Sequence, residues 1–115
     1  MIYCDKGIRN ILVERAKIGA TIQYGKLNDM LGQPYNLQSA SDRTEMGNEL
    51  GDISEFKYSQ GRPLLSSIVV NMNGTPGIGF YEMAEKVGLF DPSKQSKKKF
   101  LEEEQQKVYD FWKNY

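Results

Sequence analysis

Residues 64–72 (LLSSIVVNM) constrain the fold more than any other segment of this chain. The segment is dense in β-branched residues, and both faces that a strand would present there are largely apolar. A strand that is apolar on both faces needs cover on both sides, so we expect it to be central, with helices packed around it. The Asn73-Gly74 dipeptide that follows is typical of a tight hairpin. We therefore expect a short antiparallel sheet or hairpin, in which residues 75–78 form a return strand or loop.

Apolar residues at helical spacing predict the elements that cover this strand. A first helix follows the candidate cap Asp5 and ends at Gly19, and a short second helix covers residues 26–31. A third helix is expected over residues 43–58, with a break near Gly51, and a fourth over residues 80–87.

The last helix is expected to open at Asp91-Pro92-Ser93, to run over residues 93–115 and to pack on the core. On a helical wheel its apolar side chains fall in one stripe roughly 120° wide. These side chains are Phe100, Leu101, Val108, Phe111, Trp112 and Tyr115. A chain of 115 residues has the usual size of one domain. We expect a single α+β domain, residues 1–115, with four to five helices.

Two charged residues fall inside apolar stripes. Arg15 lies between Ile11 and Leu12 on the wheel of the first helix, and Glu104 lies within the stripe of the last helix. A buried charge is costly unless it is matched. The pattern therefore predicts a structural ion pair between Arg15 and Glu104; the alternative is that each side chain reaches the edge of its stripe.

Composition excludes several kinds of chemistry. The chain has no histidine, which removes histidine acid–base catalysis and histidine-containing metal sites. Its one cysteine, Cys4, has no histidine to activate it. We therefore expect no enzyme activity, no metal and no cofactor. No apolar run is long enough for a membrane span, and a lone cysteine fits a reducing compartment, so we expect a cytoplasmic protein without a membrane partner.

Basic residues are unevenly distributed although the net charge is zero. Lys94, Lys97, Lys98 and Lys99 cluster where the last helix begins, and the helix dipole disfavours cations there. One interpretation is a site for a phosphate backbone; the other is an exposed helix with lysine–glutamate pairs to Glu102 and Glu103. The full set predicted to contact nucleic acid is Lys26, Arg43, Lys94, Lys97, Lys98 and Lys99.

Acidic residues are concentrated in residues 27–55, which hold six acidic side chains and one basic side chain. Asp42, followed three residues later by Glu45, is predicted to cap the third helix. Four carboxylates fall in one strip roughly 80° wide if this helix is continuous. They are Asp42, Glu45, Glu49 and Asp52. The strip is either a solvated helix face or a docking surface for a basic partner.

A glycine-rich loop, residues 74–79 (GTPGIG), lies between the predicted strand and the fourth helix. Such a loop at a helix N-terminus favours anions. It has no Gly-Lys-Ser/Thr sequence, and Glu82 stands where a dinucleotide fingerprint has its third glycine. We therefore favour the interpretation of this loop as a tight structural turn over its interpretation as the binding site of a nucleotide-binding enzyme.

Residues 21–27 (TIQYGKL) followed by Leu31-Gly32 resemble the winged-helix domain of the DNA alkyltransferase and alkyltransferase-like family. Residues 44–50 (TEMGNEL) match its second helix, and residues 64–70 with Gly74 match its extended segment. The resemblance covers about residues 18–80 and implies a small winged-helix-like layout. The Pro-Cys-His-Arg motif of that family is absent, so alkyl transfer is not implied.

A second resemblance is to small uncharacterised bacterial and phage proteins, on residues 61–66 (GRPLLS) and 76–80 (PGIGF). No function is known to us for that group. We expect a non-enzymatic module that binds nucleic acid through the phosphate backbone. The alternative is a protein-interaction, inhibitor or accessory protein of a phage or mobile element that uses the acidic face of residues 42–55.

Overall fold

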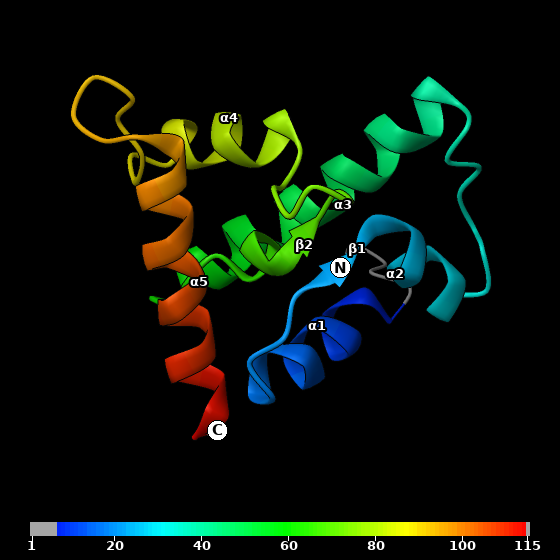
Figure 1. The fold of residues 1–115 in the computed structure, drawn as a ribbon, viewed down its shortest axis with the longest axis horizontal. Helices are drawn as coiled ribbons and strands as arrows, with labels where there is room; N and C mark the ends of the chain where they lie inside the picture. The colour runs from blue at the N-terminus through cyan, green and yellow to red at the C-terminus, as the bar shows by residue number, and fades with distance from the viewer. Residues whose placement is uncertain (1–6, 115) are drawn as a thin grey trace.

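Within the described part of the chain, five α-helices, one 3-10 helix and two short strands form an α+β fold. A computed structural model describes residues 7–114, without the side chains of residues 56 and 57. The elements are α1 (Ile8–Lys17), β1 (Ile22–Gln23), α2 (Tyr24–Met30), α3 (Ala40–Ser59), the 3-10 helix η1 (Leu65–Ile68), β2 (Val69–Val70), α4 (Ile78–Lys86) and α5 (Lys97–Lys113). Figure 1 shows α5 along one side of the molecule, α3 and α4 above, and α1 and α2 below.

The sheet is parallel, not antiparallel as predicted. β1 pairs with β2 in parallel, with Ile22 opposite Val69 and Gln23 opposite Val70. The long strand predicted over residues 64–72 is largely replaced by η1, because serine hydroxyls compete with a strand ladder for the backbone there. The Ser66 N–H donates to Ser54 Oγ at 2.9 Å, and both side chains are buried.

Hydrogen bonds at the helix ends explain why some helix boundaries differ from the predicted ones. α5 begins at Lys97 rather than at residue 93, because Ser96 Oγ caps it by accepting from the Lys99 N–H at 3.1 Å. The Asp91-Pro92-Ser93 segment is instead a turn, in which Ser93 N–H donates to Asp91 Oδ1. α3 passes through Gly51 without a break. The predicted cap Asp5 and the terminal residue Tyr115 lie outside the described residues.

The core consists of two hydrophobic clusters, and α5 contributes to both. Its first half places Phe100 and Leu101 in a cluster with α4 and Phe90. Its second half places Val108 and Trp112 in a larger cluster with α1, α2 and α3. These four residues of the predicted apolar stripe thus lie on the buried face of α5.

Glu104 is buried, but its partner is not Arg15. The carboxylate is 2% exposed, and its Oε2 accepts a hydrogen bond of 2.8 Å from the Leu64 N–H at the start of η1. Its Oε1 lies 3.7 Å from Nζ of the exposed Lys107. Among the ion pairs between described residues none joins Arg15, which is only half-buried, to Glu104. The predicted pair is therefore not formed. The Glu104 carboxylate instead faces the Leu64 N–H, which, as a donor at the start of a helix, has no helical carbonyl as its partner.

This geometry predicts a difference between Glu104 and Arg15. Glu104→Ala leaves the Leu64 N–H buried without its acceptor and should lower the free energy of unfolding by about 1–3 kcal/mol. Glu104→Gln keeps an acceptor oxygen and should cost less. Arg15→Ala should cost under about 1 kcal/mol, as usual for a surface change. Urea unfolding measures all three. An Arg15→Ala cost equal to that of Glu104→Ala would contradict the assignment.

Candidate nucleic-acid interface

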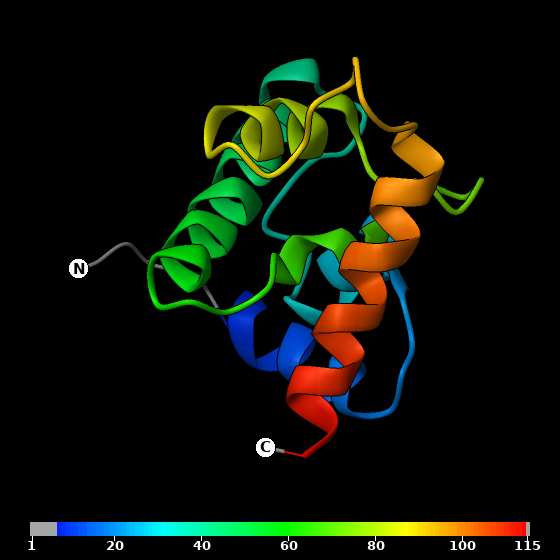
Figure 2. The same cartoon turned by 90° about the vertical axis from the view of Figure 1, so that its left-hand side faces the viewer.

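The loop after β2 and the beginning of α5 line one groove of about 620 Å³. Two motifs that are separate in the sequence, the glycine-rich loop and the lysine cluster, thus meet in space. The loop side consists of Gly74, Thr75 and Pro76, with Ile78 and Tyr81 from α4. The α5 side consists of Lys97, Lys98, Leu101, Glu102 and Gln105. Figure 2 shows the turn of this loop projecting beside the first half of α5.

Hydrogen bonds close the turn at the start of this loop. Asn71 N–H donates to the Thr75 carbonyl oxygen at 2.8 Å, and Gly74 N–H donates to the Asn71 carbonyl oxygen at 2.9 Å. Asn73 Oδ1 accepts from both the N–H and the hydroxyl of Thr75, at 3.0 and 2.7 Å. Gly74 has a φ of 86°, which favours glycine. The Asn-Gly turn therefore forms, but the chain then enters α4 rather than a return strand.

Tyr24 holds the far end of the loop. Its hydroxyl accepts a hydrogen bond of 3.0 Å from the N–H of Gly77, the residue that precedes α4. A Cβ at Gly77 would lie 3.3 Å from that hydroxyl, which is a tight contact. Burial raises the pKa of Tyr24 above its usual value, and the Gly77 N–H acts in the opposite direction. The first residue of α2 therefore fixes where α4 and the groove begin.

The lysines before and at the start of α5 are exposed, and of these Lys94 has a carboxylate within ion-pair distance. Lys94 Nζ lies 4.0 Å from Asp91 Oδ2, and both groups are exposed. Lys97 Nζ lies 5.1 Å from the centre of the Tyr81 ring. Of the carboxylates in the described residues, none forms an ion pair with Lys97, Lys98 or Lys99, so the predicted pairs to Glu102 and Glu103 are not formed. The first turn of α5 also carries no acidic residue.

Arg43 and Lys26 lie apart from these lysines. Arg43 is at the start of α3, where its Nη1 donates to the Leu37 carbonyl oxygen at 2.8 Å. Lys26 is exposed on α2. In Figure 1 the first turn of α3 is at the upper right and the first turn of α5 is at the upper left, so the six basic residues do not form one continuous patch.

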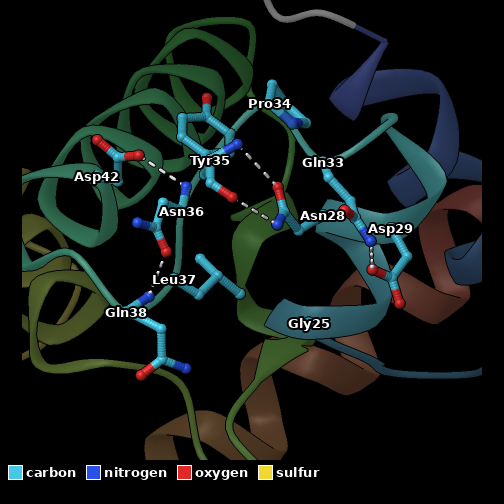
Figure 3. A pocket seen from close by; sticks show the side chains of 10 residues that line it. All are labelled: Gly25, Asn28, Asp29, Gln33, Pro34, Tyr35, Asn36, Leu37, Gln38 and Asp42. Atoms are coloured by element: carbon cyan, nitrogen blue, oxygen red, sulfur yellow. Dashed lines mark hydrogen bonds between the residues drawn. The ribbon is translucent and has the colours of Figure 1, made fainter.

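Two of the four residues in the acidic strip are engaged within the protein. Asp42 lies inside α3 and does not cap it; its Oδ2 accepts from the Asn36 N–H at 2.7 Å, as Figure 3 shows. Glu49 accepts a hydrogen bond from the Tyr35 hydroxyl. Glu45 and Asp52 are exposed. Half of the strip therefore anchors the loop that precedes α3, and the other half is open to solvent.

That loop borders a second cleft, of about 570 Å³, between α2 and α3 (Figure 3). The buried Asn28 side chain donates to the Tyr35 carbonyl oxygen at 2.9 Å and accepts from the Tyr35 N–H at 3.2 Å. Gln33, which has a φ of 62°, donates from Nε2 to Asp29 Oδ1 at 3.0 Å. These polar groups form hydrogen bonds with one another. The shape of the cleft is therefore a consequence of how these bonds hold the loop between α2 and α3.

The described residues contain no group of three or more histidine, cysteine, aspartate or glutamate side chains placed to hold a metal. Cys4 lies outside them. No helix within residues 7–114 has the length and apolar character that crossing a membrane requires. Comparison of the chain with known proteins finds no matching family model, no matching curated protein and no matching solved structure.

The role of Tyr24 makes stability depend on pH. Its folded pKa is raised above that of an unfolded tyrosine, about 10, so its contribution is complete below pH 10. The contribution is lost as the pH rises through the folded pKa. Tyr24→Phe should therefore weaken the fall in the urea midpoint as the pH rises above about 10. Tyr58→Phe, at an exposed tyrosine, should leave the profile unchanged, and equal profiles for both variants would contradict this role.

Proposed function

We propose that this protein is a non-enzymatic nucleic-acid-binding module that holds a phosphate backbone in the groove between loop 71–77 and the start of α5. The observation that carries the proposal is the meeting of this loop with Lys97 and Lys98 in one groove. In the sequence, Lys94 precedes these two lysines and Lys99 follows them. Cations placed against the helix dipole without a carboxylate partner are stabilised by an anion from outside.

The composition of the groove favours the backbone over the bases. Lysine is a flexible point charge, and the lining residues include no arginine that would read a base edge with two hydrogen bonds. Gln105, whose Nε2 also donates to the Ser67 carbonyl oxygen at 2.9 Å, adds a neutral amide of the kind that contacts phosphate and sugar. Glu102, at the same groove, opposes an anion and limits how far the backbone extends along α5. We therefore expect binding that depends weakly on sequence.

The winged-helix-like layout belongs to the same proposal. In this proposal α2 and α3 would act as the helix pair, and the turn at residues 71–75 would take the place of a wing without forming an antiparallel hairpin. Lys26 and Arg43, on that helix pair, would then form a second and separate contact. Catalysis is not part of the proposal, because the sequence offers no histidine and the groove lining has no cysteine.

Salt dependence tests this function. Binding of a fluorescent 20-base-pair duplex DNA should weaken between 50 and 200 mM KCl, with a log–log slope of about −0.9 per phosphate contact. Lys97→Ala/Lys98→Ala should make that slope shallower by about 1.8. The matched control is Lys17→Ala/Lys113→Ala, which removes the same charge from the C-terminal ends of α1 and α5. A binding constant indifferent to salt, or equal slopes for the two double variants, would refute the proposal.

A further inference from the structure

Met72 is the most exposed of the large hydrophobic side chains in the described residues, at 89%. It lies two residues beyond the buried Val70 and two before Gly74, which lines the groove. Ile78, the first residue of α4, is 68% exposed and lines the same groove. Two large apolar side chains that are exposed to solvent thus lie close together in the sequence, one in the loop and one at the first residue of α4.

The backbone that carries Met72 is held in place on both sides. Before it, Val70 is paired in the sheet with Gln23. After it, the Asn71–Thr75 hydrogen bonds close the turn, and Gly77 is bound to the Tyr24 hydroxyl. A side chain on such a backbone loses little conformational freedom when it meets a partner. Met72 is therefore exposed to solvent on a turn whose backbone is ordered.

The chemistry of this side chain restricts what it can do beside a phosphate backbone. A thioether carries no charge and no hydrogen-bond donor, so it gains nothing from phosphate. It gains from the apolar faces of bases, and apolar side chains such as methionine are used as wedges between base steps in the minor groove. A rigid, projecting turn with an apolar tip fits that use.

The rest of the groove favours a duplex over a single strand. Single strands are held by exposed aromatic rings on which unstacked bases lie. The aromatic residue among the described lining residues is Tyr81, which is buried and has Lys97 Nζ over its ring at 5.1 Å. It offers no open platform for a base. Lysines spaced along one helix fit the regular phosphates of a duplex as well as those of a strand.

We propose that the bound form is duplex DNA and that Met72 is inserted between adjacent base pairs from the minor groove, which bends the duplex. This inference rests on the proposed function, in which Lys97 and Lys98 hold the backbone at the same groove. The lysines provide affinity that depends on salt, and Met72 provides a contact that does not. The two contributions therefore separate in an experiment.

The test uses a 20-base-pair duplex with a donor and an acceptor dye at its two ends, mixed with the full chain. Wild-type protein should raise energy transfer, because a kink brings the ends together. Met72→Ala should lose this rise and bind roughly tenfold more weakly, with the salt slope unchanged. Met72→Leu should keep both. The control Ile18→Ala removes an apolar side chain of similar exposure, 73%, at the end of α1, and should behave as wild type.

The outcomes distinguish the two proposals. Absence of salt-dependent duplex binding by the wild type would overturn the proposed function and this inference with it. Salt-dependent binding with no change in energy transfer, or with Met72→Ala equal to wild type, would overturn the wedge alone. Equal or tighter binding of a single-stranded 20-mer would overturn the assignment to a duplex. A Met72→Ala variant with a shallower salt slope would show a lost phosphate contact and would also overturn the wedge.

Discussion

The hydrogen bond from the Leu64 N–H to the buried Glu104 carboxylate lies where the two hydrophobic clusters meet, and the rest of the structure depends on that junction. Leu64 belongs to the cluster around α4, and the next residue, Leu65, belongs to the cluster around α1 and α3. On α5, Glu104 lies between Leu101 of one cluster and Val108 of the other. One helix thus joins the two clusters, and a charge-assisted hydrogen bond sets its position along η1.

Placing α5 in this way also places the groove. The buried side chains of Val108 and Trp112 hold the second half of α5 and so fix the direction of its first turn, where Lys97, Lys98 and Lys99 lie. The opposite wall is fixed independently, by the β1–β2 pair before the loop and by the Tyr24–Gly77 hydrogen bond after it. Each wall is held by contacts between segments distant in the sequence. The groove is consequently a product of tertiary packing rather than of any local motif.

Particular residues show which features of the structure the sequence patterns predicted correctly. The apolar stripe of the last helix correctly indicated Phe100, Leu101, Val108 and Trp112 as buried, because helical periodicity is a local property. The Asn73-Gly74 turn was predicted for the same reason and is closed by hydrogen bonds. The prediction of an antiparallel return strand was wrong. β2 finds its partner in β1, and Pro76, which has no N–H to donate to a ladder, lies in the segment that would have returned.

The sequence by itself determined the helices, the turn, the excluded histidine chemistry and the clustering of lysines around the start of α5, because these follow from residue type and short-range spacing. Only the tertiary structure decided what each face meets. A helical wheel places Glu104 in a buried stripe, but it does not show that a backbone N–H rather than Arg15 faces the carboxylate. Similarly, no spacing rule brings loop 71–77 to Lys97 and Lys98. Contacts between distant segments depend on how the helices pack, and that is set by all the buried side chains together.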